Sequence, residues 1–199
     1  MAAQQILAFV LLLLYFGMHS VLAADPVKTW FAAWTGRNFR YYRLIYNGLA
    51  LILLLLLVRW MAGWEAHDLF APSIWTKGAA LFLLLFGAWL VAGSLWQYDL
   101  GEFSGIQQLR QENAAAQQST LNTSGFNAYV RHPLYLGTIL LLVGNFLIFP
   151  QTSALLLLVS VLVYLPFGIH FEEKKLRRQF GQAYLDYEKR VKCLFPWLW

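Results

Sequence analysis

The chain has 199 residues, of which 59% are hydrophobic and only 13% are charged. Soluble domains carry roughly 25% charged residues, so this composition excludes an ordinary soluble class and indicates a polytopic membrane protein forming one domain over residues 1–199. The formal net charge of +5 is interpreted as a sign of topology and of contact with anionic membrane lipids, with no nucleic acid as a partner.

Five apolar runs predict an all-α fold with five transmembrane helices, because backbone groups in hydrocarbon must be satisfied within each segment. The first run is interpreted as a retained span rather than a cleaved signal, since Lys28 and Arg37 follow it and no basic residue precedes it. The predicted spans are residues 4–23, 44–62, 75–97, 133–149 and 153–170.

The basic residues predict the orientation of these spans. Only Arg59 and Lys77 fall on one side, and the other 13 Lys and Arg residues fall on the opposite side, in the loops predicted at residues 25–43 and 98–131 and in the C-terminal tail. The positive-inside rule then places the N-terminus outside and the tail in the cytoplasm.

The tail after Glu173 has helical periodicity. Its apolar residues recur at steps of three or four, which predicts a C-terminal amphipathic helix on the cytoplasmic face that contacts anionic lipid. Gly181 interrupts the pattern and marks a bend or a close approach. The apolar residues are Leu176, Phe180, Tyr184, Tyr187 and Val191.

Arg131 and His132 directly precede Pro133, a residue favoured at the first position of a helix. The N-terminus of that helix attracts anions through its free N–H groups and its dipole. The short turn at residues 150–152 makes a hairpin of the last two spans, so we expect Glu172 and Glu173 to return to the level of Arg131.

This meeting of charges has two interpretations. Arg131 and the glutamates form an ordinary ion pair that ties two helix ends, or they bind a ligand that carries an amino group, a carboxylate and a cation. S-adenosylmethionine has all three features, since its sulfonium is positively charged.

Two other function classes stay open from the residues alone. Histidines from different spans, drawn from His19, His132 and His170, are potential haem ligands. A non-catalytic membrane protein or a permease is the other. Cys193 is the only cysteine, which excludes an intrachain disulfide and a cysteine-based metal cluster, and it is interpreted as an interfacial thiol. No metal site is predicted.

The C-terminal third of the chain, residues 129–196, resembles the isoprenylcysteine carboxyl methyltransferase family, which includes related phospholipid and thiol methyltransferases. The resemblance rests on three groups of residues in a fixed order. They are Arg131-His132-Pro133-x-Tyr135-x-Gly137, the pair Glu172-Glu173, and Phe180-Gly181-x-x-Tyr184-x-x-Tyr187 with Val191 and Pro196.

The resemblance implies a multi-pass enzyme, in a prokaryotic inner or plasma membrane, that takes S-adenosylmethionine from the cytoplasm and a lipophilic or lipid substrate from the bilayer. It implies a cofactor-binding core over residues 98–199 and methyl transfer to a carboxyl or thiol group. The residues that it assigns to the cofactor are Arg131, His132, Tyr135, Gly137, Glu172, Glu173, Tyr184, Tyr187 and Arg190.

Arg131, His132 and Glu102 are the candidate catalytic residues, because a thiol or amine acceptor must lose a proton and His132 or Glu102 would take it. Residues 98–108 resemble the matching stretch of bacterial thiol methyltransferases, although Gln107 stands where those relatives tend to have arginine. A phospholipid N-methyltransferase is the alternative, although that branch tends to have Gly-x-Gly where this chain has Gly101-Glu102-Phe103.

Overall fold

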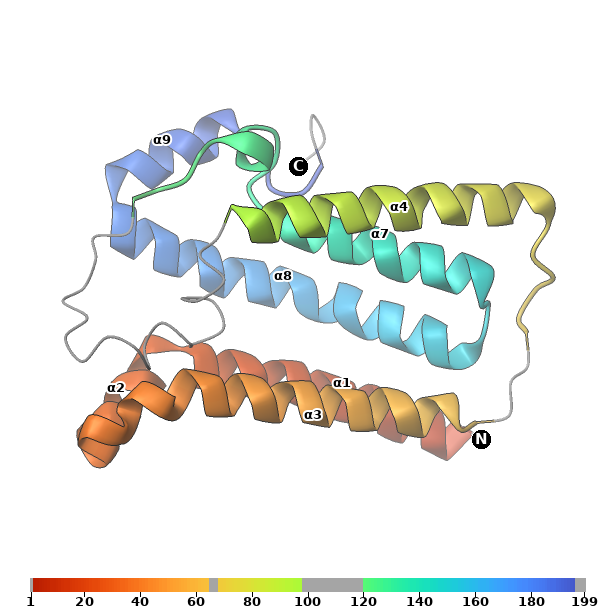
Figure 1. Ribbon diagram of the computed structural model, residues 1–199, viewed down its shortest axis with the longest axis horizontal. Helices are drawn as coiled ribbons and strands as arrows, with labels where there is room; N and C mark the ends of the chain where they lie inside the picture. Colours follow the sequence, from red (N-terminus) through yellow and green to blue (C-terminus); the bar gives the residue numbers. More distant parts are fainter. Residues whose placement is uncertain (1, 65–67, 98–119, 196–199) are drawn as a thin grey trace. The chain divides into compact units, whose positions relative to one another are not determined.

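A computed structural model of the protein describes residues 2–64, 68–97 and 120–195 (Figure 1). These residues are helical apart from turns, connecting segments and two isolated bridges. They fall into two compact units, residues 2–64 and residues 68–97 with 120–195. Each unit is considered by itself.

The first unit contains two long apolar helices, α1 (Ala2–Ala23) and α3 (Tyr42–Ala62), which pack side by side (Figure 1). Between them lie α2 (Asp25–Thr35) and the 3₁₀ helix η1 (Gly36–Tyr41), a stretch expected to be a loop. That expectation is wrong. Pro26 occupies the first turn of α2, where proline is favoured, and the Tyr42 hydroxyl donates a hydrogen bond of 2.9 Å to the Leu22 carbonyl.

The second unit contains α4 (Ile74–Trp96), the short 3₁₀ helix η2 (Gly125–Ala128), α7 (Pro133–Ile148), α8 (Thr152–Phe180) and α9 (Gln182–Arg190). Ser73 caps α4 by accepting a hydrogen bond of 3.2 Å from the Thr76 N–H. Helix α7 packs against both α4 and α8 and runs antiparallel to them, so the end of α4, the start of α7 and the later turns of α8 lie at one end of the unit (Figure 1).

The contact between α4 and α7 depends on glycine. A Cβ atom on Gly87 would lie 2.9 Å from the Gly137 carbonyl oxygen, and a Cβ atom on Gly137 would lie 2.9 Å from the Gly87 carbonyl oxygen. No side chain fits at either position unless the helices separate. Small residues allow this close approach of backbones in membrane proteins, where dispersion forces rather than water exclusion hold helices together.

Helix α8 differs from its prediction. The last span was expected to end at residue 170 and a separate amphipathic helix to follow Glu173, but α8 continues for 29 residues to Phe180. Its end is set by Gly181, whose φ of +55° only glycine adopts readily and whose N–H bonds the Arg177 carbonyl at 3.0 Å. The prediction of a single amphipathic helix after Glu173 is therefore wrong, because α9 is a separate helix of nine residues.

In the part of the chain that the structure describes, four helical stretches are long and apolar enough to cross a membrane: Ala2–Ala23, Asp25–Ala62, Ile74–Trp96 and Thr152–Phe180. With 16 residues, α7 is shorter, and at 1.5 Å per residue it rises about 24 Å, against the roughly 30 Å of a bilayer core. The protein is thus an all-α, multi-pass membrane protein, as predicted. The fifth span and the orientation stay predictions.

Candidate functional site

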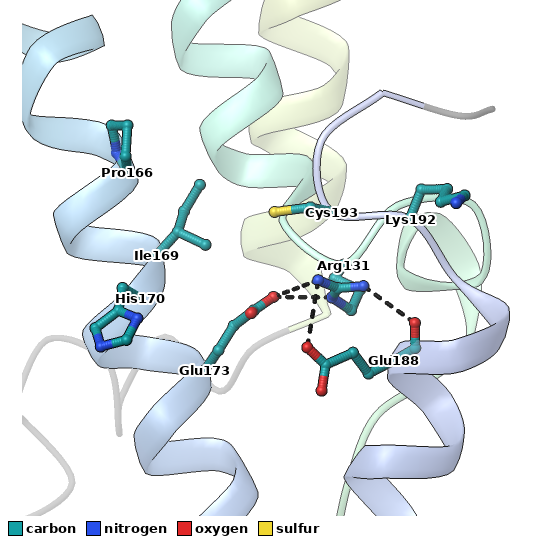
Figure 2. A pocket seen from close by; sticks show the side chains of 8 residues that line it. All are labelled: Arg131, Pro166, Ile169, His170, Glu173, Glu188, Lys192 and Cys193. Carbon is teal, nitrogen blue, oxygen red and sulfur yellow. Dashed lines mark hydrogen bonds and ion pairs between the residues drawn. The ribbon is translucent and has the colours of Figure 1, made fainter. Parts of the chain in front are cut away.

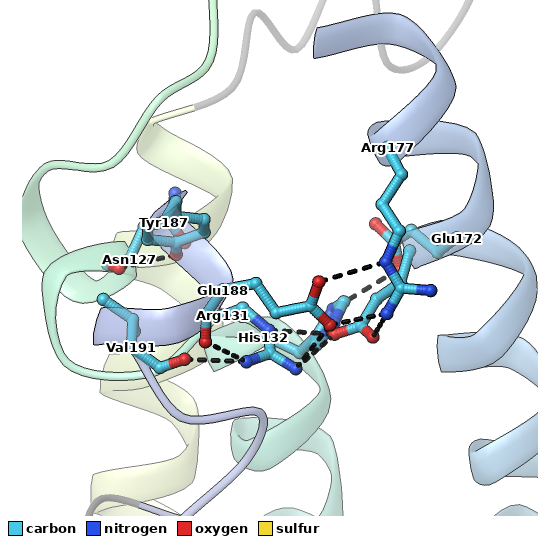
Figure 3. Close-up of polar contacts among 9 residues, drawn as sticks. Asn127, Arg131, His132, Glu172, Arg177, Tyr187, Glu188 and Val191 are labelled. Carbon is cyan, nitrogen blue, oxygen red and sulfur yellow. Dashed lines mark hydrogen bonds and ion pairs between the residues drawn. The ribbon is translucent and has the colours of Figure 1, made fainter. Parts of the chain in front are cut away.

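The segment before α7 is held by backbone pairing with the end of the described chain. The Arg131 N–H donates to the Lys192 carbonyl at 2.8 Å, and the His132 N–H donates to the Cys193 carbonyl at 3.1 Å. Helix α9 is anchored to the same segment, because the buried Tyr187 hydroxyl donates to the Asn127 carbonyl at 2.7 Å (Figure 3). Residues about 60 positions apart therefore build one local framework.

Arg131 joins three helices through one guanidinium (Figure 3). Its Nε and Nη2 donate to Glu173 Oε1 on α8 at 2.9 and 2.6 Å. Its Nη1 donates to the carbonyls of Glu188 and Val191 at 3.2 and 2.7 Å. Those carbonyls lie at the C-terminal end of α9, where the helix dipole favours a cation. The predicted meeting of Arg131 with Glu173 is confirmed.

His132 lies between the two glutamates. Its Nδ1 is 3.6 Å from Glu172 Oε2 and its Nε2 is 3.2 Å from Glu173 Oε1. The Tyr135 ring stacks on the imidazole, with the ring centroids 5.4 Å apart. Burial opposes protonation, but the hydrogen-bonding and Coulombic interactions with Glu172 and Glu173 outweigh it and raise the pKa of His132 above its usual value. The imidazolium form is favoured, and both ring nitrogens are engaged, which argues against haem ligation.

A second arginine extends the cluster formed by Arg131, His132, Glu172 and Glu173. Arg177 donates to both carboxylate oxygens of Glu188, with Nη2 to Oε1 at 2.5 Å and Nε to Oε2 at 3.0 Å, and it lies 3.3 Å from Glu173 Oε2. Arg131 Nη2 is 3.8 Å from Glu188 Oε1. The result is a ring of alternating charge between α8 and α9. The i, i+4 spacing of Glu173 and Arg177 was a signal for one of these pairs, but nothing local points to Glu188.

A cavity of about 400 Å³ adjoins this ring (Figure 2). One side is charged. The other is formed by α8, where Pro166, Ile169, His170 and Glu173 follow the i, i+3, i+4, i+7 spacing of one helix face. Its lining residues are Arg131, Pro166, Ile169, His170, Glu173, Glu188, Lys192 and Cys193.

Cys193 differs from its interpretation as an interfacial thiol. It is 7% exposed and lines the cavity. Burial and the nearby Glu173 raise the pKa of the Cys193 thiol despite the neighbouring Arg131. Sequence reasoning missed its place, because the pairing of Lys192 and Cys193 with the segment before α7 is a tertiary contact.

Tyr184 lies close to this cluster. Its side chain is 1% exposed, and its hydroxyl has no hydrogen-bond partner among the described residues. Burial, with Glu173 nearby, raises the pKa of Tyr184 and keeps the hydroxyl protonated. A buried, unpartnered hydroxyl is costly, so it suits a ligand.

The other residues assigned to the cofactor have different surroundings. Tyr187 contributes its hydroxyl to the anchor of α9 described above. Arg190 is exposed and its Nε donates to the Asp186 carbonyl at 3.2 Å. Gly137 lies in the α4–α7 contact. The candidate catalytic residue Glu102 lies outside the described residues.

Donor atoms of His132, Glu173 and Cys193 lie within 4.8 Å of one another, an arrangement that also occurs in metal sites. Here Arg131 and His132 already surround Glu173 with positive charge. A metal ion would add positive charge where the carboxylate is already compensated, so the donor set does not favour one.

Comparisons with known proteins relate the chain to one family and to named enzymes. Residues 7–194 match the family model described as NnrU protein. Methanethiol S-methyltransferase 1 of Bradyrhizobium diazoefficiens is 30% identical over 200 residues, covering 96% of this chain and 67% of the relative. Methanethiol S-methyltransferase 2 of the same organism is 31% identical over 205 residues, covering 97% and 74%.

A more distant relative is the protein-S-isoprenylcysteine O-methyltransferase of Rattus norvegicus, which is 28% identical over 137 residues, covering 66% of this chain and 46% of the relative. No solved structure matches the chain. The chain therefore belongs to the NnrU protein family, and the resemblance to isoprenylcysteine carboxyl methyltransferases and their membrane relatives is confirmed.

Proposed function

We propose that this protein is an S-adenosylmethionine-dependent membrane methyltransferase whose acceptor is a thiol group on a small lipophilic molecule. The two Bradyrhizobium diazoefficiens relatives named methanethiol S-methyltransferase cover 96% and 97% of the chain, which favours a thiol over the carboxyl group of the isoprenylcysteine enzymes. The observation that carries the proposal is the Arg131–Glu173–His132 cluster beside a cavity of about 400 Å³.

The charges of the cavity complement those of the cofactor. The carboxylates of Glu173 and Glu188 suit its amino group, and Arg131 and Lys192 suit its carboxylate. The unpartnered Tyr184 hydroxyl is a further donor close to the cluster. When bound, the cofactor supplies a methyl group activated by a positively charged sulfur.

The chain's own residues position the reactants and provide an apolar wall. His132 and Arg131 hold Glu173 from two sides, so its carboxylate is fixed before a ligand arrives. Pro166 and Ile169 give the cavity an apolar wall for the alkyl part of an acceptor. Holding two reactants in line and in contact is the main requirement of a displacement at carbon.

The predicted topology indicates from which side the cofactor and the acceptor reach the cavity. The positive-inside rule predicts that the end of the unit that carries Arg131 and Arg177 faces the cytoplasm, where S-adenosylmethionine is made. The cavity is then reached by the cofactor from water and by a lipophilic acceptor from the bilayer.

The proposal is tested by titration calorimetry of the purified protein with S-adenosylhomocysteine. Glu173→Gln removes the charge and keeps the volume, so we expect affinity to fall by about 10- to 150-fold, the effect of losing a hydrogen bond to a charged group. Asp186→Asn, at an exposed carboxylate on α9, is the control and should bind like the wild type. Absence of binding to the wild type, or equal affinity in Glu173→Gln, would refute the assignment.

A further inference from the structure

His170 lies where the apolar wall of the cavity meets its charged side. It occupies α8 between Pro166 and Glu173, one turn from each, and lines the cavity with them (Figure 2). Its side chain is exposed, and its ring contacts Phe171 with the centroids 5.7 Å apart. Within residues 2–64, 68–97 and 120–195, no hydrogen bond or ion pair engages its nitrogens.

A neutral thiol reacts slowly, because the thiolate is the nucleophile. The group that accepts its proton must face the cavity and have a free lone pair. His132 does not qualify, since both of its nitrogens face carboxylates that favour the imidazolium form.

The remaining lining groups do not qualify either. Arg131 and Lys192 have no lone pair in their charged forms. Glu173 accepts from Arg131 and His132, and Glu188 accepts from Arg177, so both carboxylates are already engaged by charged donors. Cys193 keeps its proton, because burial raises the pKa of its thiol.

We propose that His170 is the general base that takes the proton from the acceptor thiol. This inference rests on the proposed function and names a residue that it leaves open. Histidine is the side chain best matched to proton transfer near neutral pH. The position beside Pro166 and Ile169 places the imidazole next to the wall that suits the alkyl group of the acceptor.

The acceptor S–H bond breaks and its proton moves to a nitrogen of His170. The sulfur forms a bond to the methyl carbon, and the bond between that carbon and the sulfonium sulfur of the cofactor breaks with its electron pair. The products are a methyl thioether and a neutral thioether from the cofactor, and the imidazolium then releases the proton to water.

The experiment compares acceptors of different acidity in His170→Asn. With a weakly acidic alkanethiol we expect kcat to fall about 10²- to 10⁴-fold, the usual contribution of a general base. With an aromatic thiol that is already ionised at the assay pH, the loss should stay below about tenfold, because no base is needed. His19→Asn, a histidine in the first unit, is the matched control and should lose activity with neither acceptor.

Two further measurements separate a base from a structural role. Exogenous imidazole should restore alkanethiol methylation in His170→Ala. In the complex with S-adenosylhomocysteine, the ultraviolet band of a bound thiolate should appear in the wild type and be missing in His170→Asn. Cofactor affinity should be equal in all three proteins.

Equal losses with both acceptors, no rescue by imidazole, or a thiolate band that persists in the variant would overturn the role of His170. Each of these results tests the role of His170, provided that the wild type binds S-adenosylhomocysteine. If the wild type binds no S-adenosylhomocysteine, it is the proposed function that fails.

Discussion

The two sides of α7 pack by opposite means. Against α4 the contact is made by glycine, with the Gly87 and Gly137 backbones too close for any side chain. At its other side, the start of α7 meets α8 and α9 through Arg131, Glu173 and His132. The first contact is short-range and leaves no room for an added side-chain atom. The second consists of hydrogen bonds and ion pairs among charged side chains. Under the proposed function, the glycine contact supports the polar cluster that binds the cofactor.

Removing the central cation should have the largest effect. Arg131→Ala leaves Glu173 buried beside a vacancy and removes the donors to the end of α9, so we expect a loss of about 3–5 kcal/mol in unfolding free energy. Unfolding in mixed detergent measures it. Arg178→Ala, at an exposed arginine of the same helix as Glu173, is the control, and an equal loss there would show that the cluster has no special weight.

The glycine contact should break with the smallest added atom. Gly87→Ala places a Cβ 2.9 Å from a backbone oxygen and 3.0 Å from the Leu141 nitrogen, so α4 and α7 must separate, at a cost of about 1–3 kcal/mol. Gly48→Ala in α3, where a Cβ meets nothing within 4 Å, should be neutral or stabilising. Similar unfolding curves for the two variants would contradict close packing at Gly87.

The polar side should respond to pH. Because Glu172 and Glu173 raise the pKa of His132 above 6.5, its imidazolium stabilises the fold fully below pH 6.5, and this contribution is lost as the pH rises through the raised value. Unfolding of the wild type between pH 6 and 9 should therefore show a decline that His132→Gln lacks. An identical slope in both proteins would place the titration elsewhere.

The outermost pair should contribute least. Arg177 and Glu188 are 40% and 24% exposed in their side chains, so water screens their attraction. A double-mutant cycle with Arg177→Gln and Glu188→Gln should give a coupling energy of about 0.2–1 kcal/mol. A coupling energy above about 2 kcal/mol would contradict this screening and show that the pair contributes substantially to stability.

The sequence predicted the apolar helices well and their polar continuations poorly. The predicted run 133–149 matches α7, because Pro133 can begin a helix and the next apolar stretch is separated by a clear turn. The end of α8 was misplaced, since the change to charged residues at Glu173 was interpreted as a boundary although Lys, Arg, Glu and Leu all favour helix.

The candidate site was predictable where local rules apply. Arg131, His132 and Glu173 meet because a short turn makes a hairpin of α7 and α8, and the later turns of α8 return to the start of α7. Glu188, Lys192 and Cys193 join them through contacts across about 60 residues of chain, and periodicity does not reveal such contacts. Tertiary pairing, rather than any motif, brings the C-terminal segment to Arg131.

That pairing has a consequence for biosynthesis. Arg131 and His132 are synthesised before the residues whose backbone carbonyls accept their hydrogen bonds, which lie within residues 188–193. A nascent polypeptide without those residues holds the arginine and histidine without these acceptors. Under the proposed function, prematurely terminated products that lack Cys193 should therefore be inert even when correctly inserted.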